Sequence, residues 1–205
     1  MNILLVIMLI IIAYEVCAEP QSQEEHDMNE IEVKILDINR KVVEEKLIAL
    51  GACKIFDDEI HAIYYDLRDS ILKNTGKALR LRREGERTML TIKLHVENAL
   101  AKERIEHEVE VSRFEDMRTI LEGLGYAPWL EMQKHRTSYE LKGTHIELDR
   151  YSGQHAYIPE FLEIEGRDIE TIYSCAEALG FSRRDCRPWD VAELIEYYAH
   201  NKTDP

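Results

Sequence analysis

The feature that most constrains the fold of this chain is a series of short segments in which apolar residues alternate with fully charged ones. In NEIEVKI (residues 29–35), isoleucine or valine occupies every second position, and Glu30, Glu32 and Lys34 lie between them. Successive side chains of a β-strand point to opposite faces of the sheet, so a period of two predicts a strand. One face of that strand is apolar, and the other carries full charges.

The same alternation recurs in six further segments: 78–84, 88–96, 104–111, 131–141, 144–151 and 160–166. Residues 62–67 are another strand candidate. Apolar residues at helical spacing predict three helices, which end at Gly51, Gly125 and Gly180. Ser112 and Glu115 match a capping box at the start of the second helix, and a short fourth helix is predicted after Pro188. About eight strands with a few helices predict an α+β fold dominated by an antiparallel sheet.

The charged faces are segregated by sign from strand to strand. The acidic sets are Glu30/Glu32, Glu106/Glu108/Glu110, Glu147/Asp149 and Glu163/Glu165, and the basic sets are Arg80/Arg82, Lys93 and Lys134/Arg136. If the apolar sets pack outward against the helices, an antiparallel sheet closed into a barrel places these charges in a lumen. The alternative is an ordinary solvated face with cross-strand ion pairs. We favour the barrel because the helices needed to cover the apolar sets are present.

A lumen of this kind suits a polyphosphate bound together with divalent cations. Arginine offers forked donors to phosphate oxygens, and lysine offers a compact charge. Carboxylates on separate strands suit Mg²⁺ or Mn²⁺, which remove the repulsion between carboxylate and phosphate. These groups are the equipment of phosphoryl or nucleotidyl transfer. The formal net charge of −14 argues against nonspecific binding to nucleic acid, so we expect no nucleic-acid partner.

Residues 1–27 have two interpretations. The apolar run 3–13 is too short to span a bilayer comfortably, and it fits the hydrophobic region of a signal peptide. Alternatively, Met28 is the working start, because it lies directly before the first predicted strand. In both cases residues 1–27 form a hydrophobic segment and linker outside the fold. We expect the folded domain to span residues 28–198, followed by a tail of residues 199–205.

Taken together, the charged motifs resemble those of the CYTH superfamily, the triphosphate tunnel metalloenzymes, which include class IV adenylate cyclases and thiamine triphosphatases. Residues 30–34 look like the ExExK signature of the family. Residues 64–84 resemble the tyrosine–aspartate turn of the family and the basic RxR strand that follows it. LTIK, HEVEV, KHR, ELD and FLEIEG then follow in the order of the family. The resemblance implies an eight-stranded tunnel with helices packed outside.

The resemblance also implies roles for the charged residues. Four carboxylates are the implied metal ligands: Glu30, Glu32, Glu163 and Glu165. Six cations are implied to hold the triphosphate: Lys34, Arg80, Arg82, Lys93, Lys134 and Arg136. The implied catalytic residues are Glu32, Lys93 and Asp149. The residues implied to support the basic groups or a second metal are Arg104, Glu106 and Glu108.

The implied activity is that of a metal-dependent enzyme of the class IV adenylate cyclase type, which converts ATP to cyclic AMP and pyrophosphate. One alternative is a triphosphatase that hydrolyses the terminal phosphate of an inorganic or thiamine-type triphosphate. A second alternative is a nucleotide- or polyphosphate-binding module without turnover. Because nucleoside triphosphates are cytosolic, we expect a cytoplasmic protein, and export or anchoring through residues 1–18 is the alternative. The resemblance also makes a homodimer an expectation.

Overall fold

The computed structural model describes residues 31–96 and 103–201 of the chain. The predictions for residues 1–27, Glu30 and the last four residues of the tail lie outside the described residues. Arg104 lies within a described strand, but its side chain is outside the described part. Within the described ranges, no helix combines the length and the apolar character that crossing a membrane requires.

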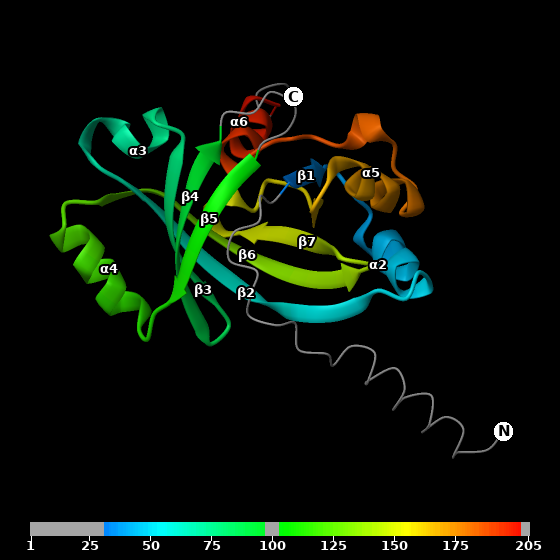
Figure 1. Cartoon of the computed structure of the whole chain (residues 1–205), viewed down its shortest axis with the longest axis horizontal. Coiled ribbons are helices and arrows are strands. Elements are labelled where there is room, and N and C mark those ends of the chain that lie inside the picture. The colour runs from blue at the N-terminus through cyan, green and yellow to red at the C-terminus, as the bar shows by residue number, and fades with distance from the viewer. Residues whose placement is uncertain (1–30, 97–102, 202–205) are drawn as a thin grey trace, which may run out of the picture.

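Eight strands form one antiparallel sheet in the order β1-β8-β7-β6-β2-β3-β4-β5. The strands are β1 (Ile31–Ile35), β2 (Cys53–Asp66), β3 (Lys77–Glu84), β4 (Arg87–Val96), β5 (Glu103–Glu110), β6 (Ala127–Leu141), β7 (Thr144–Ser152) and β8 (Phe161–Gly166). The sheet curls strongly about its own axis (Figure 1). The predicted α+β fold with an antiparallel sheet of about eight strands is therefore confirmed. β2 is much longer than the predicted segment 62–67, and β6 begins four residues before the predicted segment 131–141.

The curled sheet is a half-barrel with β1 and β5 at its two ends, rather than a ladder closed by hydrogen bonds between them. The outer edge of β1 has another partner, because Lys34 and Arg187 exchange two backbone hydrogen bonds of 2.8 Å each. In a closed barrel, β5 would pair with this edge of β1. Here the segment around Arg187, which precedes α6, occupies the edge instead. The curvature of the sheet encloses the lumen, and Val191 and Ala192 at the start of α6 form part of its wall.

The described residues form five α-helices and three short 3₁₀ helices, which connect the strands or follow β8: α2 (Arg40–Ala49), α3 (Ile71–Asn74), α4 (Phe114–Gly123), α5 (Ile169–Ala178), α6 (Val191–Asn201), η1 (Arg68–Ser70), η2 (Gly153–His155) and η3 (Arg183–Asp185). The capping box predicted at Ser112 is wrong. Helix α4 begins one residue later, with Arg113 at its N-cap and no side-chain hydrogen bond to the cap. Ser112 therefore precedes the capping position. Helix α5, in contrast, is capped by Asp168, whose Oδ1 accepts a hydrogen bond from the Thr171 amide at 2.8 Å.

The apolar face of the sheet points outward and is covered by helices in separate places. Helices α2 and α5 cover β1, β7 and β8, where Leu47 and Ile172 are fully buried against Ile164. Helix α4 covers β2 and β3 through Phe114 and Leu121. Burial of this surface supplies the main driving force for folding. The predicted direction of the apolar sets, outward against helices, is thereby confirmed.

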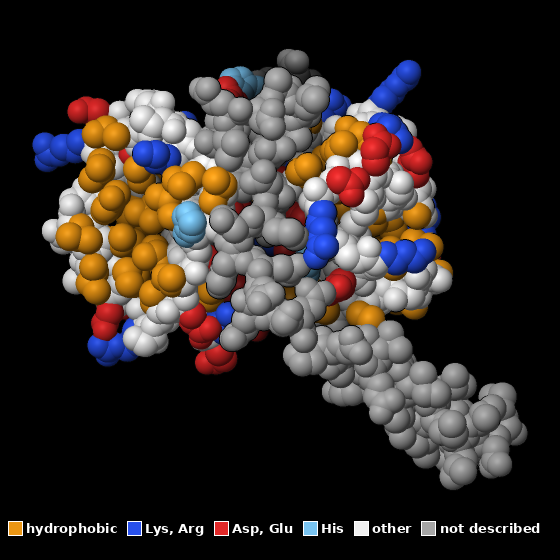
Figure 2. Space-filling model, viewed as in Figure 1, with side chains coloured by type: hydrophobic (Ala, Val, Ile, Leu, Met, Phe, Trp, Pro, Cys, Tyr) orange, Lys and Arg blue, Asp and Glu red, His pale blue; other side chains and the backbone are white. Residues whose placement is uncertain are grey.

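The outer surface near α4 is only partly covered. Val109 on β5, Ile120 on α4 and Leu124 at the C-cap of α4 keep 57%, 52% and 68% of their surface exposed. Figure 2 shows apolar side chains gathered on the side of the molecule where Figure 1 places α4. The charged side chains lie instead on the inner face of the sheet, where they surround a cavity.

Candidate active site

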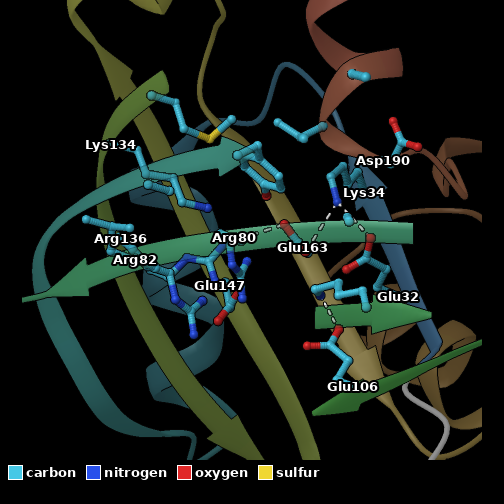
Figure 3. Close-up of a pocket in the computed structure, with 18 of the residues that line it drawn as sticks. Glu32, Lys34, Arg80, Arg82, Glu106, Lys134, Arg136, Glu147, Glu163 and Asp190 are labelled. Carbon is cyan, nitrogen blue, oxygen red and sulfur yellow. Dashed lines mark hydrogen bonds and ion pairs between the residues drawn. The ribbon is translucent and has the colours of Figure 1, made fainter. Parts of the chain in front are cut away.

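The inner face of the curled sheet encloses a cavity of about 430 Å³ whose wall is mostly charged (Figure 3). The sequence-predicted residues that line it are Glu32, Lys34, Arg80, Arg82, Lys93, Glu106, Glu108, Lys134, Arg136, Glu163 and Glu165. They come from six strands, so the curvature of the sheet brings together motifs that lie far apart in the sequence. The predicted inward direction is confirmed for these residues, and the alternative of an ordinary solvated face is wrong for them. Glu110, predicted in the same set as Glu106, is instead exposed and pairs with Arg87.

Strand register places the acidic side chains next to each other. Glu32 on β1 pairs with Glu165 on β8, and Glu147 on β7 pairs with Glu163 on β8. Carboxylate oxygens of Glu32, Glu163 and Glu165 lie within 4.8 Å of one another, and the same holds for Glu147, Asp149 and Glu163. Glu163 belongs to both clusters. All of these ligand atoms are carboxylate oxygens, the donors that hard divalent cations prefer, so the clusters fit Mg²⁺ or Mn²⁺.

Lys34 lies between the carboxylates of the first cluster. Its ammonium group is 3.3 Å from Glu32 Oε1 and 3.2 Å from Glu163 Oε1, and only 4% of the residue is exposed. Burial disfavours the charged ammonium, but Glu163 and Glu32 outweigh this effect and raise the pKa of Lys34. Lys34 is therefore charged at neutral pH and compensates part of the negative charge of the cluster.

Asp149 holds two cations of the cavity wall in place. Its carboxylate accepts hydrogen bonds from Arg136 Nε at 2.8 Å, from Arg136 Nη2 at 2.6 Å and from Lys134 Nζ at 2.5 Å. Burial would raise the pKa of Asp149, but Arg136 and Lys134 lower it below its ordinary value. Asp149 has no exposed surface, so in this structure its carboxylate serves the two cations and does not face the cavity.

The opposite wall of the cavity is basic and is held by acidic residues of β5. Glu108 Oε2 lies 3.8 Å from Arg80 Nη2, 3.4 Å from Arg82 Nη2 and 2.5 Å from the Thr91 hydroxyl, which donates to it. Lys93 on β4 forms an ion pair with Glu106, which lies opposite it on β5. Glu106 and Glu108 thus lie in contact with the cations of this wall.

An unsatisfied hydrogen-bond donor of Arg80 points to an anionic ligand. Its Nε is buried and has no hydrogen-bond partner among the described residues. Burial disfavours the guanidinium charge, but Tyr64, Glu106 and Glu108 outweigh this effect and raise the pKa of Arg80. A buried donor without a partner costs free energy unless a ligand satisfies it. An anion in the cavity would supply that acceptor.

Several residues of the wall escaped the sequence analysis as site residues. Glu147 could have been found, because it lies two residues before Asp149 on the same charged face and forms an ion pair with Arg136. Its pKa is raised by burial and by the neighbouring Glu163 and Asp149, against the effect of Arg136. Other lining residues lie close to the ends of strands and helices, where no periodic signal marks them: Lys73 in α3, Lys77 at the start of β3, Trp129 near the start of β6 and Asp190 before α6.

Comparisons with known proteins agree with this geometry. The CYTH domain family matches residues 28–183. A protein of Methanocaldococcus jannaschii named as a candidate adenylate cyclase, MJ0240, is 32% identical over 139 residues, which are 67% of this chain and 77% of that protein. The solved structure of PH1012 from Pyrococcus horikoshii is 27% identical with a TM-score of 0.68, and the match covers 80% of this chain and 98% of PH1012.

A plant structure shares the fold at lower identity. HpAC1 from Hippeastrum, described as a candidate adenylyl cyclase with a dominant triphosphatase activity, is 16% identical with a TM-score of 0.57. The match covers 87% of this chain and 98% of HpAC1. The family match spans most of the sequence, and the curled sheet carries its charged motifs around one cavity. This chain therefore belongs to the CYTH domain family.

Proposed function

We propose that this protein is a divalent-metal-dependent enzyme that acts on triphosphates, with the reaction of an adenylate cyclase: ATP is converted to cyclic AMP and pyrophosphate. The observation that carries the proposal is the shared position of Glu163. It belongs to two carboxylate clusters and also contacts Lys34 and Arg136, so metal ligands and phosphate-binding cations meet at one point. The name of the relative at 32% identity supports the choice of reaction.

Glu32, Glu163 and Glu165 would hold Mg²⁺ or Mn²⁺, and Glu147 would complete a second position next to Glu163. A bound divalent cation supplies charge neutralisation to phosphate oxygens and orients the triphosphate. Because carboxylates alone would repel a triphosphate, the acidic wall and the anionic substrate are compatible only through such cations.

The cations of the chain itself would bind the triphosphate from the other sides. Arg80 and Arg82 offer forked donors from β3, and Arg136 is held in a fixed orientation by Asp149. Lys93 lies on the adjacent strand β4 and adds a point charge for the pyrophosphate that leaves. In this proposal Asp149 is a positioning residue, since its carboxylate is taken up by Lys134 and Arg136.

Cyclisation and hydrolysis differ in the attacking oxygen and in the phosphorus atom attacked. In cyclisation the ribose 3′-hydroxyl attacks the α-phosphorus, its proton is lost, and the bond to the β-phosphate breaks with release of pyrophosphate. In hydrolysis water attacks the terminal phosphorus and loses its proton, the bond from that phosphorus to the bridging oxygen breaks, and the products are orthophosphate and the diphosphate part of the substrate. The same grip on the triphosphate serves both reactions. HpAC1, at 16% identity, shares only the fold with this chain. Triphosphatase activity, which is dominant in HpAC1, is therefore the alternative result that the test must distinguish.

The test is product analysis with the purified full chain. ATP, thiamine triphosphate and inorganic tripolyphosphate are each incubated with Mg²⁺ or Mn²⁺, and products are separated by anion-exchange chromatography. We expect cyclic AMP and pyrophosphate in equal amounts from ATP. Orthophosphate as the product would show that the protein is a triphosphatase and not a cyclase. Binding of ATP without any product would contradict an enzymatic function and support a binding module.

A further inference from the structure

A β-bulge changes the direction of one aromatic side chain at the mouth of the cavity. In the ladder between β2 and β6, Tyr64 pairs with Leu130 and Tyr65 pairs with Pro128, so Trp129 is an additional residue without a partner in the ladder. A bulge of this kind shifts the alternation of a strand by one residue and re-aims a side chain.

The consequence of the bulge is visible in the alternation of β6. Lys134 and Met132 line the cavity, whereas the side chain of Glu131 is 53% exposed and contacts His61 outside. Continued alternation would place Trp129 on the outside together with Glu131. Instead Trp129 lines the cavity, and 42% of the residue is exposed at its mouth. The bulge therefore brings a large indole ring to the entrance of a site whose interior is charged.

Trp129 has an aromatic neighbour and a cationic neighbour in the wall of the cavity. The Tyr64 ring lies 5.9 Å from the indole at an angle of 58°, and the Lys73 ammonium lies 5.1 Å above the indole ring. Val191 and Ala192, at the start of α6, line the same cavity. Figure 1 shows α3, which carries Lys73, and α6 along the upper side of the view.

Helix α3, which carries Lys73, is anchored to the end of β2 by hydrogen bonds to Asp66. The buried carboxylate of Asp66 accepts hydrogen bonds from the backbone amides of Leu67 at 2.7 Å, Leu72 at 2.8 Å and Lys73 at 2.9 Å. The backbone of α3 is thus anchored, while the long side chain of Lys73 is exposed and free to change rotamer. One face of the indole becomes available when that side chain moves toward solvent.

We infer that Trp129 forms a stacking subsite for the aromatic ring of an organic triphosphate, an inference that rests on the proposed function. Tyr64 connects the two regions, because it pairs in register with Arg80 and contacts Trp129 on its other side. A triphosphate held by Arg80 and Arg82 extends toward this mouth, where the indole offers a π-face. Stacking on an aromatic side chain tolerates different rings, so the subsite selects organic triphosphates over inorganic ones.

Trp129→Ala tests the subsite by its selectivity. We expect the KM for ATP to rise about 10-fold or more, as the loss of one base-stacking contact predicts. The inhibition constant of inorganic tripolyphosphate, measured as a competitor of ATP, should stay within about twofold because tripolyphosphate has no ring to stack. Trp129→Phe should restore most of the affinity for ATP. Trp189→Ala is the matched control, since Trp189 contacts Arg187 and Tyr197 instead of the cavity.

Tryptophan fluorescence gives a second readout that does not depend on turnover. The chain has two tryptophans, so Trp189→Phe leaves Trp129 as the single reporter. ATP should quench its emission in the presence of Mg²⁺, and tripolyphosphate at equal occupancy should not. If tripolyphosphate competes while Trp129→Ala leaves the KM for ATP unchanged, the subsite is wrong and the proposed function stands. If neither ATP nor tripolyphosphate binds the wild-type protein, both are wrong.

Discussion

The Asp149 carboxylate and the Arg136 guanidinium form a bidentate pair, with Nε to Oδ1 at 2.8 Å and Nη2 to Oδ2 at 2.6 Å. Asp149 is fully buried, and Arg136 is 7% exposed. Two parallel hydrogen bonds fix the plane of the guanidinium, which is also in contact with Glu163. The cation is thus oriented before any ligand enters the cavity. This pre-organisation is the reason why a fully buried aspartate matters for a site that it does not line.

Replacing Asp149 with asparagine should destabilise the protein strongly. The change leaves Arg136 and Lys134 buried without their shared counter-charge, and breaking such a pair costs about 3–5 kcal/mol. Urea denaturation followed by circular dichroism measures the loss. Asp116→Asn on the exposed surface of α4 is the control, because its ion pair with Arg113 is solvent-screened. A loss below about 1 kcal/mol for Asp149→Asn would mean that the pair does not support the wall.

The basic residues of β3 should separate into two functional groups by their direction. Arg80 faces the cavity, whereas Arg83 is exposed on the outside and lies 5.3 Å from the Phe114 ring. We expect Arg80→Ala to raise the KM for ATP and the inhibition constant of tripolyphosphate together, by about 10-fold or more, because charge-assisted hydrogen bonds are lost. Arg83→Ala should leave both constants unchanged. Equal effects of the two substitutions would contradict the inward direction of Arg80.

Substitution of the proposed metal ligands should remove turnover and preserve the fold. Glu32→Gln and Glu165→Gln keep the size of the side chain but remove a charge from the first cluster, so we expect kcat to fall by about 100-fold or more. Thermal melting should show a folded protein in each case. Glu110→Gln is the control, because Glu110 pairs with Arg87 on the exposed end of β5. Wild-type turnover in either cavity variant would overturn the assignment of the metal cluster.

Chelation offers a test without any substitution. EDTA should abolish turnover of ATP, and an excess of Mg²⁺ or Mn²⁺ should restore it, because the carboxylates around Glu163 would otherwise repel the triphosphate. Initial rates before and after addition of the metal measure the effect. Full activity in EDTA, after removal of adventitious metal, would be incompatible with the proposed role of the acidic wall.

The anchoring of α3 by Asp66 predicts a dependence of stability on pH. Burial opposes the charge of Asp66, but the backbone amides of Lys73, Leu72 and Leu67 lower its pKa below the ordinary value. This stabilisation is complete above the unfolded pKa of about 3.9 and is lost as the pH falls through the lower folded value. Asp66→Asn should therefore reduce the free energy of unfolding at pH 7 by about 1–3 kcal/mol.

The penalty for Asp66→Asn should shrink below pH 4, where the wild-type carboxylate also becomes protonated. Asp69→Asn, in the same loop, is the matched control, because asparagine tolerates the left-handed backbone of that position (φ +67°). Denaturation curves at several pH values measure both variants. A penalty that is independent of pH would show that the charge of Asp66 contributes nothing.

Periodicity predicted the parts of the fold that depend on local pattern. The alternation in β1, β3 and β8 placed Lys34, Arg80 and Glu163 on the inner face, and the structure confirms each of them. Charge could be assigned to a face without knowledge of the partner strands, because side-chain direction in a strand depends only on the parity of the position. For the same reason the resemblance to the CYTH family could rest on short motifs in a fixed order.

Features that depend on a partner element could not be predicted in this way. The bulge at Trp129 is a property of the register between β2 and β6, and the edge of β1 is occupied by Arg187, more than 150 residues away in the chain. The cap at Ser112 was wrong because the start of α4 shifted by one residue. The burial of Asp149 follows from packing around Arg136, which no periodic pattern encodes.

Binding of manganese tests the central claim, a metal centre built on Glu163, most directly. The signal of free Mn²⁺ in electron paramagnetic resonance is followed while the full chain is titrated, with wild type and Glu163→Gln compared after thermal melting confirms that both are folded. We predict that the wild-type protein removes Mn²⁺ from solution and that Glu163→Gln weakens binding by about 10-fold or more. Equal binding of Mn²⁺ by the two proteins would contradict the account.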